Sequence, residues 1–260
     1  MNLHKLFLTE NACYKAGRKI MVKGIMVHST GVNNPNLKCY VAPDDGLLGK
    51  NQNGSHWNTY HPGGREVCAH AFIGRLADGS IAAYQTLPWN HRGWHAGGSA
   101  NDTHIGFEIC EDGLTDDTYF KKVYREAVQL SAFLCKEYGL TEQSIVCHSE
   151  GYQQGIASNH ADVMHWFPKH DKSMDTFRAE VKDLLTSDTE EDTGDTAGSA
   201  VSYPEMLTSG YYRVRKKWKD SESQVGAYRS LSNAKAAVDK APGTFVFANN
   251  GTAIYPADET

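Results

Sequence analysis

Histidine is the residue type whose distribution in this sequence points most directly to chemistry. All twelve histidines of the 260-residue chain lie within residues 1–170, and none lies in the remainder. Neutral imidazole is a common zinc ligand, and imidazole also transfers protons near neutral pH. We therefore expect the chemistry of this protein to reside in its first 170 residues.

Two histidines end apolar, strand-like runs. His28 follows G-I-M-V, and His148 follows S-I-V-C. Ligands and catalytic groups collect at strand ends in α/β sheets, although a single histidine there is more often a hydrogen-bonded structural residue. A catalytic zinc site needs three protein ligands and an open position for water. Asp162 would complete such a set, with His160 and His165 as the alternative third ligands.

A carboxylate lies inside another apolar run, T-H-I-G-F-E-I-C. Strand alternation places Glu108 on the face opposite to Ile105, Phe107 and Ile109. A carboxylate between apolar neighbours is costly unless it is paired or functional. We expect Glu108 to transfer protons in a hydrolase; the alternative is a solvated residue on an open sheet face.

The elements that would position these residues alternate between strands and helices. Short apolar or β-branched runs predict strands, and Asp78-Gly79 predicts a hairpin turn. Helical spacing predicts a helix over residues 119–138, with Asp116 or Asp117 as its cap and Gly139 at its end, and a second helix over 174–185. The predicted strands are residues 23–30, 67–74, 80–87, 103–110 and 144–149. This pattern indicates an α/β or α+β domain with one sheet, joined by a long loop over residues 33–66.

The domain organisation is predicted from an acidic segment. Residues 187–202 contain five acidic side chains, no Lys or Arg and almost no apolar side chain, so we expect a linker. It would separate a domain of residues 1–186 from a small α+β domain of residues 203–260. In that second domain we expect a strand over 210–218, a helix over 231–240 capped by Ser232, and a hairpin around Asn249-Asn250-Gly251.

Composition excludes several classes of protein. The net charge of −5 argues against nucleic acid as a partner. No run approaches the about 20 apolar residues of a membrane helix, and the first residues do not resemble a secretory signal. The six cysteines form no C-x-x-C pair, and we expect them to be reduced thiols. They are Cys13, Cys39, Cys68, Cys110, Cys135 and Cys147.

Five motifs together carry a resemblance over roughly residues 20–186. In chain order they are G-I-M-V-H-S-T around His28; C-A-H-A-F-I with a following D-G; G-W-H-A-G at 93–97; I-G-F-E at 105–108; and I-V-C-H-S-E at 145–150, followed by N-H-A-D-V-M-H-W. This order resembles the type-2 N-acetylmuramoyl-L-alanine amidases, which include phage lysins and peptidoglycan recognition proteins. The resemblance implies an α/β fold with a mixed central sheet flanked by helices.

The resemblance also implies a zinc enzyme that cuts the amide between N-acetylmuramic acid and L-alanine. Carried over by motif, the metal ligands are His28, His148 and Asp162, and the proton carrier is Glu108. Many relatives have a lysine two residues before the third ligand, where this chain has His160, which would take over stabilisation of the oxyanion. Expected to orient the ligands or line the groove are His70, His95, Trp94 and His165. The alternatives are a non-catalytic peptidoglycan-binding protein and a zinc peptidase that cuts within the stem peptide.

Residues 211–235 resemble the small wall-attachment modules of cell-wall hydrolases, with a likeness to SPOR repeats. This implies binding of residues 203–260 to cell-wall glycan, besides peptidoglycan as the substrate, and no nucleic acid or membrane insertion. We expect a phage or prophage endolysin, made in the cytoplasm without a signal peptide and released at lysis through a holin. A bacterial autolysin exported by another route is the alternative.

Overall fold

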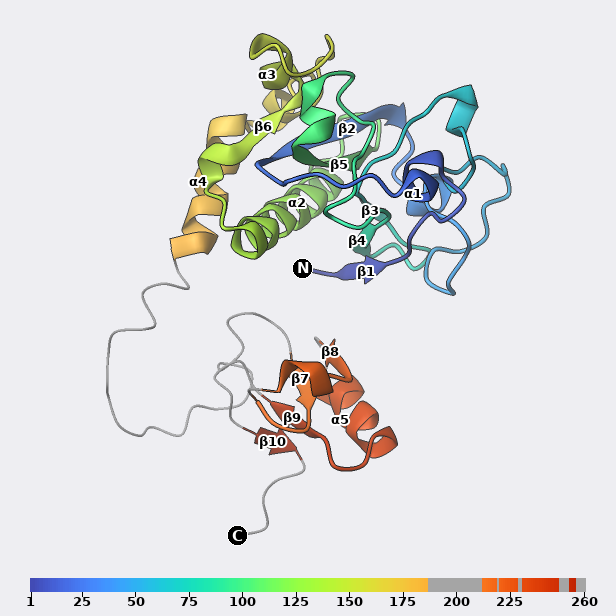
Figure 1. Cartoon of the computed structure of the whole chain (residues 1–260), viewed down its shortest axis with the longest axis vertical. Helices are drawn as coiled ribbons and strands as arrows, with labels where there is room; N and C mark the ends of the chain where they lie inside the picture. Colours follow the sequence, from blue (N-terminus) through green and yellow to red (C-terminus); the bar gives the residue numbers. More distant parts are fainter. Residues whose placement is uncertain (187–211, 219, 229–230, 248–252, 256–260) are drawn as a thin grey trace. The chain divides into compact units, whose positions relative to one another are not determined.

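The computed structural model describes residues 1–186, 212–218, 220–228, 231–247 and 253–255 (Figure 1). The chain divides into two compact units, Met1–Thr193 and Gly194–Thr260. The predicted linker at 187–202 lies outside the described residues. The predicted domain boundaries therefore stay a prediction, and each unit is described by itself.

The first unit contains a six-stranded mixed sheet in the order β1-β4-β3-β5-β2-β6. All neighbouring strands are parallel except β3 and β4, which form the predicted antiparallel hairpin. At the hairpin turn, the Asp78 carboxylate accepts a hydrogen bond from the main-chain N–H of Ser80. The strands are β1 (Leu3–Lys5), β2 (Gly24–Asn33), β3 (Ala71–Arg75), β4 (Ile81–Gln85), β5 (His104–Glu111) and β6 (Ile145–Cys147).

The long helix α2 (Asp117–Tyr138) covers one face of this sheet together with α4 (Met174–Thr186) (Figure 1). The carboxylate of Asp116 caps α2 by accepting from the N–H groups of Thr118 and Tyr119, and Gly139 ends the helix in the left-handed conformation. Both predicted helices are therefore confirmed. The short helices are α1 (Ala12–Ala16) and α3 (His148–Gln153), with 3-10 turns at Leu37–Cys39, Pro62–Gly64, Ser99–Asp102, Glu142–Ser144 and Phe167–His170.

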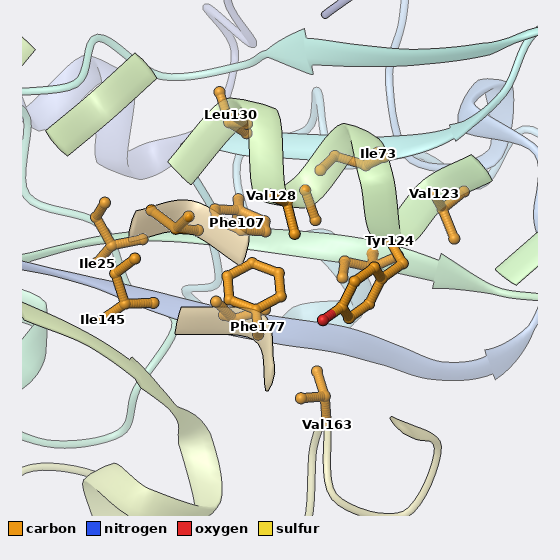
Figure 2. Close-up of a cluster of buried hydrophobic side chains, with 14 of the residues drawn as sticks. Ile25, Ile73, Phe107, Val123, Tyr124, Val128, Leu130, Ile145, Val163 and Phe177 are labelled. Carbon is orange, nitrogen blue, oxygen red and sulfur yellow. The ribbon is translucent and has the colours of Figure 1, made fainter. Parts of the chain in front are cut away.

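The main core lies between α2, α4 and the sheet. Strand residues Ile25 and Phe107 meet Val128 of α2 and Phe177 of α4 there (Figure 2). In β5 the expected alternation is present, because Ile105, Phe107 and Ile109 all belong to this core. Glu108 and His28 therefore project from the opposite face of the sheet.

Several sequence predictions differ from the structure. The expected strand over 144–149 ends at Cys147, because His148 begins α3. The strand expected from residue 67 begins only at Ala71. Neither β1 nor α1 was predicted, since elements of three and five residues are too short to show a hydrophobic period.

The expectation of six reduced cysteines is wrong. Cys13 and Cys68 form a disulfide across 55 residues of sequence, while Cys39, Cys110, Cys135 and Cys147 are free thiols. Sequence spacing does not show that these two residues have Cα atoms 6.4 Å apart. The bond joins the N-terminal segment to the strand-like residues before β3.

The same N-terminal segment supports part of the long loop. The side-chain amide of Asn11 donates to the carbonyl oxygens of Trp57 and Val67 at 3.1 and 3.0 Å. The main-chain N–H of Ala12 donates to the Tyr60 oxygen at 3.1 Å. These bonds and the disulfide fix residues 57–68 against α1, although this stretch contains no strand or α-helix.

The described residues of the second unit contain a four-stranded antiparallel sheet in the order β10-β9-β7-β8 and one α-helix. The helix has the predicted bounds, but Ser232 lies inside it, so the prediction that Ser232 caps it is wrong. The strand β8 was not predicted, and the Asn-Gly turn lies outside the described residues. The elements are β7 (Tyr212–Arg215), a 3-10 turn (Ser221–Ser223), β8 (Gly226–Tyr228), α5 (Leu231–Lys240), β9 (Phe245–Phe247) and β10 (Ala253–Tyr255).

Among the helices of the described residues, none combines the length and apolar composition needed to span a bilayer.

A buried carboxylate makes the stability of the first unit depend on pH. Glu126 of α2 is 7% exposed, and its carboxylate accepts a hydrogen bond from the main-chain N–H of Asn2. Burial raises the pKa of Glu126 from 4.5 to about 7. The folded state therefore holds this proton more tightly than the unfolded state, and stability falls as the pH rises from about 4.5 to about 7.

We predict that Glu126→Gln is more stable than the wild type above pH 7, by at most about 3 kcal/mol, and much less so at pH 5. Urea unfolding at pH 5 and pH 8, followed by tryptophan fluorescence, measures this difference. Glu137→Gln, which changes an exposed carboxylate of the same helix, serves as the control. A Glu126→Gln effect that does not grow with pH would contradict the prediction.

Candidate metal centre

Strand pairing places the predicted site residues at one edge of the sheet. In the parallel pair β2–β5, His28 lies opposite Glu108. In the parallel pair β2–β6, Val27 lies opposite Cys147, so His148 follows immediately beside His28. Asp162 comes from the loop after α3, 134 residues from His28 in sequence.

Three potential ligand atoms converge at this edge. His28 Nδ1 lies 3.0 Å from Asp162 Oδ2 and 3.2 Å from His148 Nδ1, and the separation of His148 Nδ1 and Asp162 Oδ2 is 3.6 Å. Both imidazoles are buried, whereas the Asp162 side chain retains slight exposure. Among the described residues, these three form the group of side chains that could hold a metal ion.

The protonation of this group suits a cation. Burial lowers the pKa of His28, which favours the neutral ring that a metal requires. Asp162 supplies a carboxylate oxygen 3.0 Å from His28 Nδ1 and 3.6 Å from His148 Nδ1. Two imidazole nitrogens and one carboxylate oxygen match the ligands of catalytic zinc sites.

Glu108 lies in an environment that perturbs its proton affinity. Burial, followed by the nearby carboxylates of Asp162 and Glu111, raises the pKa of Glu108 well above its usual value. Its Oε2 atom is buried and has no hydrogen-bond partner among the described residues. A buried carboxyl group whose pKa is shifted in this way is a candidate for proton transfer.

A cavity of about 550 Å³ opens onto these residues. His28, Glu108, His148 and Asp162 line this cavity, and its other wall residues include part of the loop that α1 supports. Those wall residues are Trp57, Arg65, Glu66 and Val67, together with Trp94, His95, Gly97, Ser158 and His160. Arg65, Glu66 and Ser158 were not singled out from the sequence, since they lie in loops without a period or a motif.

The other predicted site residues occupy different positions. His160 lines the cavity, and its Nδ1 lies 3.1 Å from Ser158 Oγ. Trp94 lines it and is 40% exposed, with the Arg92 guanidinium 4.9 Å from its ring centroid. His165 instead pairs with Glu111 at 2.9 Å, outside the group of three.

Neither His70 nor His95 belongs to the group of three candidate ligands. His70 is buried, and the main chain engages both of its nitrogens, because Nε2 donates to the His91 oxygen and Nδ1 accepts from the Gly106 N–H. It does not line the cavity. His95 Nδ1 lies 2.9 Å from His28 Nε2, so its ring contacts a candidate ligand directly.

We predict that Asp162→Asn, which keeps the size of the side chain and removes its charge, lowers zinc affinity at least about tenfold. His165→Asn and His160→Asn, which alter the alternative third ligands, should retain that affinity. Isothermal titration of metal-free protein with Zn²⁺ measures all three. Loss of affinity in His165→Asn but not in Asp162→Asn would assign the third ligand to His165.

Comparison with known proteins places this chain in a family. The sequence profile of the N-acetylmuramoyl-L-alanine amidases matches residues 17–167. The N-acetylmuramoyl-L-alanine amidase XlyA of Bacillus subtilis (strain 168) is 41% identical over 68 residues, which are 25% of this chain and 22% of XlyA. The match thus spans about a fifth of the length of that relative.

Solved structures show a similar fold. The hydrolase AmiA of Staphylococcus aureus superimposes with a TM-score of 0.53 at 17% identity, covering 74% of this chain and 86% of AmiA. The catalytic domain of XlyA gives a TM-score of 0.48 at 25% identity, over 70% of this chain and 99% of that domain. The likeness to AmiA and the order of the strands confirm the expected fold, a mixed sheet flanked by helices. Since the family profile matches more than half of its residues, this chain belongs to the N-acetylmuramoyl-L-alanine amidase family.

Proposed function

We propose that this protein is a zinc-dependent amidase that hydrolyses the bond between N-acetylmuramic acid and L-alanine in peptidoglycan. The observation that carries the proposal is the convergence of His28, His148 and Asp162 beside Glu108 in one cavity. Family membership supplies the class of reaction. A zinc ion held by these three side chains would polarise the scissile carbonyl and lower the pKa of a water molecule.

Glu108 is the proton carrier in this proposal. Its carboxylate takes a proton from the attacking water and delivers it to the nitrogen of the leaving L-alanine. The unpartnered Oε2 supports this role, because no described residue competes for that atom. Its position opposite His28 on the adjacent strand keeps it on the same side of the sheet as the ligands.

His160 stabilises the negative charge that develops on the carbonyl oxygen. Ser158 Oγ contacts the Nδ1 of His160, which leaves Nε2 as the ring nitrogen that can donate to an oxyanion when the ring is protonated. The ring centroids of His160 and His148 are 4.6 Å apart, so this donor would act close to the metal ligands.

The cavity walls suit a substrate made of sugar and peptide. Trp57 and Trp94 present aromatic rings, whose apolar faces can pack on a sugar while their edges remain near polar groups. Retention of the full set of three candidate ligands argues against the alternative of a receptor without catalysis.

We predict that Glu108→Gln slows the release of free amino groups from peptidoglycan by about 10²- to 10⁴-fold while zinc remains bound. Glu66→Gln changes a carboxylate elsewhere on the same cavity wall and is the matched control. The measurement is amine release per molecule of protein, with zinc content determined on the same samples. A Glu108→Gln variant that keeps the wild-type rate would remove this residue from the mechanism.

We propose further that residues 203–260 bind the cell wall. In the described part of this unit, Lys216 and Lys217 are exposed beside Trp218, and the Arg215 guanidinium lies 5.5 Å from the Trp218 ring centroid. Cationic and aromatic groups together suit an anionic, sugar-containing polymer. Attachment of this kind raises the local concentration of substrate at the catalytic unit.

We predict that reversing the charge of Lys216 and Lys217 to Glu in the Glu108→Gln chain weakens its sedimentation with purified cell walls. The same reversal of Lys121 and Lys122, an adjacent exposed pair on α2, is the matched control. Raising the salt concentration should weaken the binding of the unreversed chain as well. Equal sedimentation of both double-reversal proteins would contradict the proposed wall-binding surface.

We also propose that the protein is a phage or prophage endolysin, made in the cytoplasm and released to the cell wall through a holin at lysis. The supporting observations are its membership of this amidase family and the cavity suited to peptidoglycan. A bacterial autolysin exported by another route is the second candidate.

A further inference from the structure

His95 connects a candidate metal ligand to the main chain. It belongs to the segment G-W-H-A-G at residues 93–97, between β4 and β5. Its Nδ1 lies 2.9 Å from His28 Nε2, and its Nε2 lies 3.2 Å from the carbonyl oxygen of His104. These groups therefore form a hydrogen-bond network that runs from a main-chain carbonyl, through two imidazoles, to the Nδ1 of His28.

The carbonyl of His104 determines the direction of each hydrogen bond in this network. A carbonyl oxygen can only accept, so the proton of a neutral His95 must lie on Nε2, leaving Nδ1 as an acceptor. His28 must then donate from Nε2. In a neutral His28 this leaves the lone pair of Nδ1 directed toward Asp162 Oδ2, at 3.0 Å.

A second hydrogen-bond network acts in the same way on His148. The hydroxyl of Ser158 donates to the carbonyl oxygen of Ala96 at 3.2 Å. Its oxygen therefore accepts from Nε2 of His148 at 3.3 Å and from Nδ1 of His160 at 3.1 Å. In a neutral His148 this leaves a lone pair on Nδ1. Because Ala96 follows His95 directly, one short segment contributes a group to each of the two hydrogen-bond networks.

Close packing holds these groups in place. A Cβ atom on Gly106 would lie 2.4 Å from the His95 ring, and one on Gly97 would lie 2.5 Å from Ser158 Oγ. The side chain of Asn101 accepts from the main-chain N–H groups of His95 and Ala96, both at 2.9 Å. The glycines allow close approach, and Asn101 fixes the backbone of the segment.

We propose that His95 and Ser158 are positioning residues that set the tautomers of His28 and His148, so that both Nδ1 lone pairs face the Asp162 carboxylate. Three acceptor atoms then lie 3.0 to 3.6 Å apart with no proton between them, an arrangement that a cation relieves. The proposal deepens the proposed function, since it rests on the same metal site, and it predicts a site organised before zinc binds.

The tautomers can be read directly in the full-length protein. In the metal-free wild type labelled with ¹⁵N-histidine, long-range ¹H–¹⁵N spectra should show the His28 proton on Nε2. A proton on Nδ1, donating to Asp162, would overturn the proposal without any variant. Should the wild type show the Nε2–H tautomer and bind no zinc, the proposed function fails while the tautomer assignment stands.

Two variants of similar shape test the hydrogen bond between His95 and His28. His95→Asn can place an oxygen acceptor where Nδ1 was, whereas His95→Leu cannot accept. We expect His95→Leu to populate the Nδ1–H form of His28 and to lower zinc affinity about 10- to 100-fold, with His95→Asn much closer to the wild type. An unchanged His28 tautomer in a folded His95→Leu protein, judged by its circular dichroism and melting temperature, would refute the role of His95.

Ser158→Ala tests the second network and serves as a control for the first. In this variant we expect His148 to populate both tautomers and zinc binding to weaken, while His28 keeps its proton on Nε2. If Ser158→Ala leaves the His148 tautomer unchanged, Ser158 does not set it.

Discussion

The parallel pairing of β2 with β5 on one side and β6 on the other is the constraint on which the site depends. It aligns the carboxyl ends of three strands, so that His28, Glu108 and His148 meet although up to 120 residues separate them. The register of this strand pairing is as important for the site as the parallel direction of the strands. Ile25 and Val27 point into the core against α2, and a slip of one residue would turn His28 into that core.

The electrostatics of the site follow from this placement. A cluster of buried imidazoles is stable only if the rings are neutral and their nitrogens are hydrogen-bonded, since unpaired buried polar groups are costly. The main-chain oxygens of His104, Ala96 and His91 provide these partners for His95, Ser158 and His70. In the tautomers proposed for His28 and His148, the Nδ1 atoms that face Asp162 carry no proton, and a cation would bind there.

The sequence predicted those features that depend on local patterns. Helix α2 has an amphipathic period, a capping Asp116 and a terminating Gly139, and it was predicted to within two residues. The alternation in β5 placed Glu108 opposite the core. Features that depend on tertiary contact were not predicted, among them the Cys13–Cys68 disulfide and the loop residues Arg65 and Glu66 of the cavity wall.

The third ligand shows the same limit. From the sequence Asp162 was the expected third ligand, but His160 and His165 stayed open as alternatives, because all three follow His148 in one irregular stretch. The structure brings Asp162 to His28 and pairs His165 with Glu111. His95 was expected from the resemblance to orient a ligand or line the groove, but its contact with His28, 67 residues away, is seen only in the structure.

The central claim is that the protein cuts the amide bond between N-acetylmuramic acid and L-alanine. It is tested most directly by digesting purified peptidoglycan with and without a chelator and identifying the fragments by mass spectrometry. The account predicts free peptides that begin with L-alanine beside intact glycan, lost on chelation and restored by Zn²⁺. New termini within the stem peptide, or retention on the wall without cleavage, would contradict it.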